Sequence, residues 1–422
     1  FFLLFLLIPV VGFLFWLIQK PDSFLSGYHN RDFTLTERVL TEARVLLFYL
    51  KQILIPSVAE LGLYHDDITI SRGLLNPVTT VFSVISLIFI LVTALLLTRR
   101  APLVSLGILW FFAGHTLEST IMPLEIAHEH RNYLADYGIL LAAGAAVLHL
   151  GKAMQITYIQ TLTPALFICL FAYTTWVRAG QWSDNVTHAV FEATHHPESP
   201  RALLSAGRIH ARLAINGRSE SIESAFRYLE RASEIDKSGI LPEVVMIKLA
   251  SILELPVDKE WYNIVTNKLK YPIDAAKINA LHILGECQWS VCDTPRQTME
   301  IIYQATLNNH SLQGTERLGH VYASYATYQI NALGRPDLGR EYFIMAVKAA
   351  PKELQHWINL LKLLLKMQDY DAAEHWLAAF RSADAIGATK HDYERFMSRI
   401  SKGRTKNMAE TSMTDGATSK SN

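Results

Sequence analysis

Long apolar runs alternate with short polar turns up to about residue 182, and mixed polar and apolar positions fill the rest of the chain. A bilayer core about 30 Å thick requires about 20 apolar residues in helical form. Five runs meet or approach this length: 1–18, 78–98, 102–122, 133–150 and 158–177. The pattern therefore predicts a multi-pass membrane domain over 1–182, followed by a linker over 183–198.

The polar segment between the first two runs carries its own helical pattern. Apolar residues recur every three or four positions over 34–55, and charged residues, among them Arg38 and Arg44, interrupt them. This spacing predicts an amphipathic helix that lies along the membrane interface and ends before Pro56.

Beyond the linker, the pattern indicates tetratricopeptide-type helical repeats over 199–400, with a period near 34 residues. The clearest unit starts at Leu354 and alternates large and small residues that let two helices interlock. The positions of this pattern are Trp357, Leu360, Leu364, Ala372, Trp376 and Ala379, and earlier Ala206, Gly207, Ala225, Leu229, Ala232, Gly339, Phe343 and Ala346. The predicted fold class is all-α, a membrane helical bundle followed by a soluble α-solenoid. The composition of 401–422 predicts a disordered tail.

Basic residues in short turns predict the orientation. Arg99 and Arg100 follow the second run and Lys152 follows the fourth, so the positive-inside rule places both turns in the cytoplasm. We therefore expect an inner (plasma) membrane protein whose loop 19–77, segment 123–132 and repeats all lie on the extracytoplasmic, periplasmic side.

The net charge bears on the class of binding partner, and the cysteines bear on disulfide formation. The formal net charge is +0, which argues against nucleic acid as a partner. Cys287 and Cys292 are close neighbours in the soluble part, while Cys169 lies in an apolar run. If the soluble part is exported, the two neighbours can pair as a disulfide; two free buried thiols are the interpretation that we favour from the sequence.

The strongest candidate site is Glu129, His130 and Arg131, between two apolar runs. A charge of this kind costs roughly 2.5–3.5 kcal/mol at the centre of a membrane helix, so the segment belongs at the interface or in a polar cavity. Arg offers a planar fork of donors and His a further donor, which fits anion recognition. The competing interpretation is that Glu129 and Arg131 pair with loop charges.

A metal site is not expected from these residues. His128 and His130 are two positions apart, whereas the H-E-x-x-H pattern places two histidines four apart on one helix face. The pair His195 and His196 precedes Pro197 in the linker, where we expect a solvated turn. Arg178 follows the last apolar run and is a further candidate at the interface.

The chain begins at Phe1 with apolar residues that lack the features of a signal peptide. We interpret them as the remainder of a transmembrane helix and expect a longer protein upstream.

The order of these parts resembles the transmembrane and tetratricopeptide repeat-containing glycosyltransferases. The resemblance lies in Thr36–Pro56 followed by Leu63-Tyr-His, in Glu129-His-Arg-Asn-Tyr-Leu134, and in His196-Pro-Glu-Ser-Pro-Arg-Ala202 before the repeats. Ala135 stands where the family usually has proline. The resemblance covers roughly residues 30–385, in short pieces.

The resemblance implies a multi-pass transferase that moves a sugar from a polyprenyl-phosphate carrier to a protein acceptor, without a covalently bound cofactor. It implies that Glu129, His130 and Arg131, with Tyr133 in the same segment, hold the carrier phosphate or shape the acceptor cleft, and that the repeats bind the acceptor. The acidic catalytic residues of the family lie in an upstream loop, so no catalytic residue is assigned in this chain.

Two other hypotheses remain open. The first is a non-catalytic membrane-anchored scaffold whose repeats gather protein partners. The second, ranked last because no suitable His-containing loop is found, is an enzyme like the O-antigen ligases or polymerases.

Overall fold

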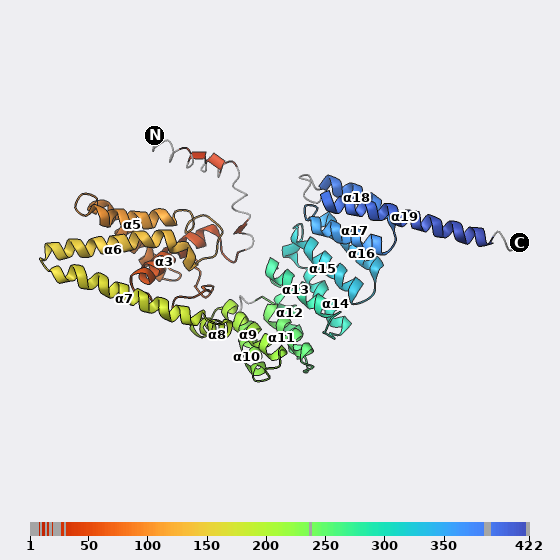
Figure 1. Ribbon diagram of the computed structural model, residues 1–422, viewed down its shortest axis with the longest axis horizontal. Coiled ribbons are helices and arrows are strands. Elements are labelled where there is room, and N and C mark those ends of the chain that lie inside the picture. The colour runs from red at the N-terminus through yellow and green to blue at the C-terminus, as the bar shows by residue number, and fades with distance from the viewer. Residues whose placement is uncertain are drawn as a thin grey trace. The chain divides into compact units, whose positions relative to one another are not determined.

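The computed structural model of the chain describes residues 31–235, 239–383 and 390–418, with a few isolated positions before residue 31. The regular secondary structure of the described residues is helical, apart from one isolated β-bridge between Gly73 and Asn76. The all-α expectation is therefore confirmed. The chain divides into two compact units, 1–235 and 236–422 (Figure 1). The predicted span 1–18 falls outside the described residues, except for isolated positions.

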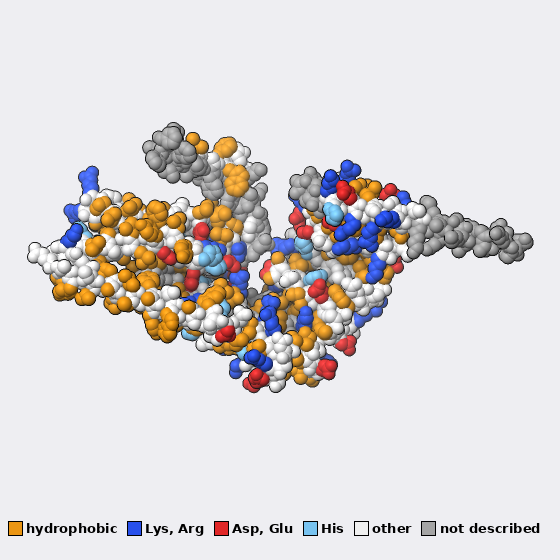
Figure 2. Space-filling model, viewed as in Figure 1, with side chains coloured by type: hydrophobic (Ala, Val, Ile, Leu, Met, Phe, Trp, Pro, Cys, Tyr) orange, Lys and Arg blue, Asp and Glu red, His pale blue; other side chains and the backbone are white. Residues whose placement is uncertain are grey.

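Three helices of the first unit are long and apolar enough to cross a membrane. They are α4 (Thr79–Leu97), α6 (Tyr133–Ala153), which continues from the short 3₁₀ helix η1 (Glu129–Asn132), and α7 (Thr157–Gln181). At 1.5 Å per residue, even the shortest is about 28 Å long. Leu96 and Trp176 are 75% and 73% exposed, and Figure 2 shows hydrophobic side chains spread over this unit. Exposed apolar surface of this extent is typical of membrane contact.

The predicted span 102–122 is wrong in its extent. Helix α5 covers only Pro102–His115, about 21 Å, which is short of a bilayer core. After His115, threonine hydroxyl groups donate hydrogen bonds to backbone carbonyl oxygens. Thr116 donates to Phe112 O at 3.0 Å, and Thr120 donates to Thr116 O. The remaining residues up to 122 form turns rather than more helix.

Helices α5 and α6 run antiparallel in very close contact. A Cβ added to Gly107 would lie 2.3 Å from Gly138 O, and one added to Gly138 would lie 2.5 Å from Gly107 O. Small residues allow such backbone approach between apolar helices. Near the other end of the contact, Gly114 faces Ala135. The α4–α5 turn and the α6–α7 turn therefore lie at one end of the bundle, and η1 lies at the other end.

Helix α3 (Leu35–Leu54) lies where the amphipathic pattern predicts it. Thr34 and Glu37 form a reciprocal capping box at its start, and the helix ends just before Pro56. Its buried face includes polar residues that the apolar pattern did not predict, Arg38 and Glu42 among them. The helix packs against α4 and α6, so protein covers part of the face expected to meet lipid.

The predicted linker 183–198 is instead largely helical. Helix α8 (Asn185–His195) begins after Asp184, whose carboxylate accepts from the backbone of Val186 and Thr187 at 2.9 Å. Helix α8 packs on α9 (Pro200–Ile215), which pairs with α10 (Ser221–Glu234). The α9–α10 contact contains the predicted small and large residues Ala206, Gly207, Ala225, Leu229 and Ala232, and a Cβ on Gly207 would lie 2.7 Å from Leu229.

The second unit is a succession of helices, each of which packs on the next helix in the chain or on the next but one. They are α11 (Leu241–Ile252), α12 (Lys259–Lys268), α13 (Ala275–Cys287), α14 (Arg296–Leu307), η3 (His310–Leu312), α15 (Arg317–Asn331), α16 (Pro336–Ala349), α17 (Leu354–Lys366), α18 (Tyr370–Ala383) and α19 (Lys390–Thr418). Trp357 of α17 packs 6.2 Å from Phe380 of α18, and Leu360 and Leu364 are fully buried. The predicted α17–α18 unit is therefore present as a packed helix pair.

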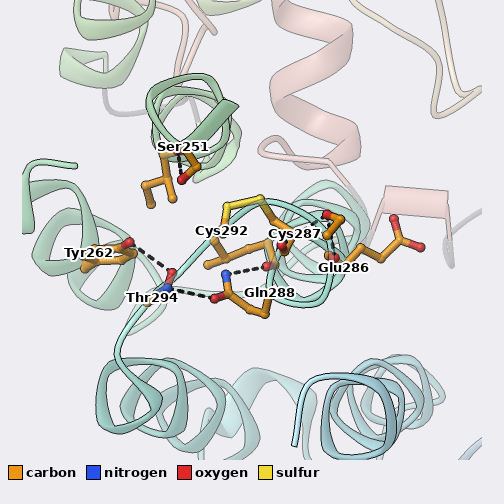
Figure 3. The surroundings of a disulfide bond; sticks show 10 residues. Ser251, Tyr262, Glu286, Cys287, Gln288, Cys292 and Thr294 are labelled. Carbon is orange, nitrogen blue, oxygen red and sulfur yellow. Dashed lines mark hydrogen bonds between the residues drawn. A yellow bond between two sulfur atoms is a disulfide. The ribbon is translucent and has the colours of Figure 1, made fainter. Parts of the chain in front are cut away.

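Cys287 and Cys292 form a disulfide, with their Cα atoms 5.1 Å apart (Figure 3). The bond closes the turn after α13, where the backbone N–H of Cys292 also donates to Cys287 O at 2.8 Å. Gln288 accepts from the Thr294 N–H at 3.1 Å and holds the next residues of the turn. The free-thiol interpretation favoured from the sequence is thus corrected, because the turn brings the two side chains together.

The predicted disordered tail also differs from the structure, in which α19 extends to Thr418. Phe396 and Ile400 of this helix are buried against the second unit, at 0% and 4% exposed. Packing there removes the cost of helix nucleation, and extension by residues such as Lys, Met, Ala and Glu is then favourable.

Candidate functional site

Three segments of the first unit meet beside the start of η1. They are the loop 55–78 after α3, the segment 116–132 between α5 and α6, and the turn 196–199 between α8 and α9. Helix α6 begins here and α7 ends towards α8, so the site lies at the end of the bundle away from the α6–α7 turn. Residues far apart in the sequence thus converge at one end of the apolar helices.

Arg38 of α3 holds the segment 116–132 in place. Its guanidinium donates to the carbonyl oxygens of Leu124 at 2.6 Å, Glu118 at 2.7 Å and Glu125 at 3.3 Å, and it forms an ion pair of 2.8 Å with Glu42. Both side chains are almost fully buried. Burial raises the pKa of Glu42 to about 7, although the charge of Arg38 opposes the shift. Arg38 is therefore a structural cation, not one available to a ligand.

Tyr49 positions the next part of the same segment. The His128 N–H donates to the Tyr49 hydroxyl at 2.7 Å, and that hydroxyl lies 3.4 Å from the His128 carbonyl oxygen. Glu129 follows directly, and its carboxylate accepts from the Gly62 N–H at 2.8 Å. It also lies 3.3 Å from His65 Nε2. Glu129 therefore connects η1 with the loop after α3.

His65, Asp67, Glu129 and His196, named here the imidazole–carboxylate cluster, form the centre of the site. His196 Nδ1 lies 2.9 Å from Asp67 Oδ2, and the rings of His65 and His196 pack edge to face at 5.3 Å. His65 and His196 are buried, at 6% and 7% exposed.

The pKa values of this pair follow from their contact. The hydrogen bond to Asp67 raises the pKa of His196 above its ordinary value, against the effect of burial. Burial acts to raise the pKa of Asp67, but its hydrogen bond with His196 and the charges of both histidines hold that pKa below its ordinary value. The contact thus favours an imidazolium–carboxylate pair.

Arg131 lies near the cluster but faces other carboxylates. It donates to the Glu125 carbonyl oxygen at 2.8 Å and lies 3.9 Å from the carboxylate of Glu118 and 3.7 Å from that of Glu125. Glu125 also accepts from Arg201 of α9 at 2.9 Å. Burial acts to raise the pKa of Glu125, but the hydrogen bond with Arg201 prevails and lowers it. These contacts form an Arg–Glu network across the segment and α9.

Helix α8 contributes a fully buried carboxylate, Glu192. It accepts from the Leu63 N–H at 2.8 Å and lies 3.9 Å from the guanidinium of Arg178 and 4.0 Å from His188 Nδ1. Burial lowers the pKa of His188, so this imidazole favours the neutral form. Arg178, expected at the interface, thus faces Glu192 in the last turn of α8.

The other predicted site residues lie at the edge of this arrangement. His130 is exposed and its ring packs 3.9 Å from that of His128, while Tyr133 is 87% exposed. Arg44 of α3 donates to the Thr69 carbonyl oxygen at 2.6 Å. Of the residues predicted to form the site, only Glu129 belongs to the imidazole–carboxylate cluster.

His65, Asp67 and Glu192 were not predicted from the sequence, and the solvated turn predicted for His196 was wrong. His196 is buried, not part of a solvated turn, because Asp67 and the loop 55–78 cover it. The available signal was the run His65-Asp66-Asp67, together with His196 close before a helix start. Neither pattern indicates that positions 129 residues apart meet.

Comparisons with known proteins identify no relative of the chain: no family model, no curated protein and no solved structure matches it. Its function is therefore argued from the geometry of the site.

Proposed function

We propose that this chain belongs to an integral-membrane glycosyltransferase that takes a sugar from a polyprenyl-phosphate carrier and passes it to a protein acceptor. The observation that carries the proposal is the position of the imidazole–carboxylate cluster. Its residues lie beside the start of α6, at the end of the bundle where α7 leads to α8. A lipid-linked substrate presents its phosphate and sugar at that depth of a bilayer, and its chain would lie along the apolar helices.

The charged groups around the cluster suit such a substrate. His130 is exposed and precedes Arg131, whose guanidinium is 15% exposed between two carboxylates. We assign these two residues to the carrier phosphate, with the exposed Tyr133 beside them. Glu129 then orients the loop 55–78 by accepting from Gly62 and facing His65. These roles use Arg as a planar donor and His as a second donor.

The orientation that we propose is extracytoplasmic for the site and for the second unit, in an inner (plasma) membrane. The Cys287–Cys292 disulfide supports it, since disulfides persist in oxidising compartments. The basic turns with Arg99, Arg100 and Lys152 lie at the opposite end of the bundle, as the positive-inside rule requires of a cytoplasmic face.

The paired helices after α8 supply the acceptor-binding part of the proposal. Their small and large residues interlock as tetratricopeptide-type repeats do, and stacked repeats of this kind form extended surfaces for protein ligands. We therefore propose that the repeats bind the protein acceptor.

A membrane-anchored scaffold without catalysis is the second candidate, and one observation favours it. Arg131 already lies within 4 Å of Glu118 and Glu125, so its charge is balanced inside the protein. In a scaffold this network would only fix the segment 116–132, and the helical repeats would carry the function.

Sugar transfer by the full-length gene product in membranes that contain the host's lipid-linked sugars separates the two candidates. Glycosylated proteins would be identified by mass spectrometry for the wild type, Arg131→Ala and the matched variant Arg99→Ala at the opposite end of the bundle. We expect Arg131→Ala to reduce transfer at least tenfold and Arg99→Ala to leave it unchanged. An unchanged rate in Arg131→Ala would overturn its assigned role, and no transfer by the wild type would favour the scaffold.

A further inference from the structure

The imidazole–carboxylate cluster contains a set of ligands for a metal ion. One ligand atom from each of His65, Asp67 and His196 lies within 4.8 Å of the other two. We propose that these three residues bind a divalent transition-metal ion of the zinc class. The proposal does not depend on sugar transfer, because it concerns the ion and its ligands only.

The ligand chemistry selects the class of ion. Two imidazoles and one carboxylate are typical ligands of zinc and related divalent ions, whereas Mg²⁺ and Ca²⁺ prefer an all-oxygen shell. Ligand atoms about 2.1 Å from a tetrahedral ion lie about 3.4 Å from one another. His196 Nδ1 and Asp67 Oδ2 are 2.9 Å apart, and the three ligand atoms lie within 4.8 Å of one another. Side-chain movements that shift these atoms by about 1 Å would therefore bring all three to a common ion.

A second carboxylate orients one of the ligands. His65 Nε2 lies 3.3 Å from Glu129 Oε1. In the tautomer with the proton on Nε2, this nitrogen donates to Glu129, and Nδ1 of the same ring is the one that would bind the ion. Metal-binding histidines usually donate their other N–H to a carboxylate or a carbonyl in this way. Glu129 itself is held by the Gly62 N–H at 2.8 Å. Glu129 thus supplies the second hydrogen bond that typically orients a metal-binding histidine.

His196 provides a further observation. Its Nε2 atom is buried, in a side chain that is 9% exposed, and has no hydrogen-bond partner among the described residues. A Cβ on Gly62 would lie 2.6 Å from this nitrogen and 3.0 Å from Glu192 Oε2. Asp67 is hydrogen bonded to Nδ1, and the unpaired Nε2 is the kind of buried polar atom that a bound ion satisfies.

The ion would join two parts of the first unit. His65 and Asp67 belong to the loop 55–78, and His196 caps α8 immediately before α9, the first helix of the repeats. A bound ion would therefore fix that loop to the turn that leads into the first helix pair. Three protein ligands leave a fourth position of a tetrahedral ion for water or an anion.

Metal binding is tested on the full chain, purified in detergent with a histidine-free affinity tag and depleted of metal by a chelator. The purified protein is titrated with Zn²⁺, and separately with Co²⁺, whose visible absorption reports nitrogen and oxygen ligation. The variants are Asp67→Asn and His196→Gln. The matched control is His195→Gln, because His195 is exposed and hydrogen bonds only within α8.

We expect one Zn²⁺ per chain in the wild type and in His195→Gln, and affinity at least tenfold weaker in Asp67→Asn and His196→Gln. Equal affinity in all four proteins, or no stoichiometric binding by the wild type, would overturn the proposal. Size-exclusion profiles without metal identify any variant that fails to fold. If His196→Gln fails to fold, the Asp67→Asn titration decides, because Asp67 is the more exposed of the pair. A wild-type protein that binds Zn²⁺ but transfers no sugar would contradict the proposed function and leave the metal site unaffected.

Discussion

His196 and Asp67 form a hydrogen bond of 2.9 Å between Nδ1 and Oδ2, across 129 positions of the sequence. Two further contacts join the same elements: Glu192 accepts from the Leu63 N–H, and Ser199 donates to Asp66. The loop after α3 is thus held to α8 and to the start of α9. Its order depends on residues that lie beyond all the apolar helices in the sequence.

Replacing Asp67 by Asn is expected to loosen the loop 55–78. A hydrogen bond to a charged group contributes about 1.5–3 kcal/mol, so local opening should become roughly tenfold or more frequent. Hydrogen exchange of loop peptides in the full chain, corrected for intrinsic rates, measures this change. Glu60→Gln is the matched control in the same loop, because its partly exposed ion pair with Lys51 of α3 contributes little. Equal exchange in the two variants would show that other contacts hold the loop.

The helices were predictable from the sequence wherever periodicity or length is distinctive. The apolar runs indicated α4, α6 and α7, and the spacing of small and large residues indicated the α9–α10 and α17–α18 pairs. Such patterns are local, and each reports burial or packing of the helix that contains it. The C-terminal end of α5 and the helical state of 185–195 were missed, because neither follows from apolar periodicity; the helix 185–195 starts at the Asp184 cap.

The site was predictable only in part. Glu129 was identified because a charge between apolar runs is unusual, and that argument uses neighbours in the sequence. His65, Asp67 and His196 are individually ordinary polar residues on loops. Their relationship arises only in the folded first unit, where the loop after α3 meets the turn after α8. A single sequence does not report such contacts between distant segments.

The contact of Gly107 with Gly138 makes α6 intolerant of even one methyl group at that position. A Cβ on Gly138 would lie 2.5 Å from Gly107 O and 3.0 Å from Phe111 N, so α5 and α6 must move apart in Gly138→Ala. We expect a loss of about 1–3 kcal/mol in stability, as for other overpacked sites. Thermal unfolding in detergent measures the loss.

Gly144→Ala is the matched control in the same helix. No atom lies within 4 Å of the Cβ that would be added there, so the variant should be neutral or slightly more stable, since Ala favours a helix. Equal melting temperatures for the two variants would contradict the close contact.

His356 should make the second unit sensitive to acid. Burial, with a smaller contribution from His320 of α15, lowers the pKa of His356 to about 4, while Glu353 opposes the shift. Below pH 6.5, its ordinary pKa, the unfolded chain takes up a proton that the folded chain does not. The stabilisation is complete above pH 6.5 and is lost as the pH falls towards 4, by about 3 kcal/mol in total.

Hydrogen exchange of peptides from α15 in the full chain tests this expectation between pH 7 and 4. These peptides contact the region of His356 but do not contain it, so their intrinsic rates are the same in every variant. His356→Leu should show a smaller loss of protection as the pH falls than the wild type. Parallel pH profiles for the two proteins would assign the acid sensitivity to other groups.

The disulfide is expected to stabilise the turn after α13. Cys287 and Cys292 are five positions apart, and the chain-entropy model gives about 2 kcal/mol for a loop of that size. Alkylation of the denatured, unreduced protein should label the free, exposed Cys169 and neither of the paired cysteines. Reduction should make all three reactive and increase hydrogen exchange in the turn. Labelling of Cys287 without reductant would show that the bond is absent in the isolated protein.

Arg38 and Glu42 should be strongly coupled, because the pair is buried and Arg38 also binds three carbonyl oxygens. Arg38→Met leaves Glu42 buried without its partner, and losing one member of such a pair costs about 3–5 kcal/mol. Arg38→Lys keeps the charge but not the planar fork of donors, so it should recover only part of the loss.

The double variant Arg38→Met/Glu42→Leu completes a cycle that isolates the coupling of the pair. Because it removes the uncompensated carboxyl group, it should be more stable than Arg38→Met alone, although the three carbonyl oxygens still lose their donor. Thermal unfolding of all variants in one detergent measures these differences. If the effects of Arg38→Met and of Glu42→Leu simply added in the double variant, the ion pair would contribute nothing, and the carbonyl contacts alone would explain why α3 buries an arginine.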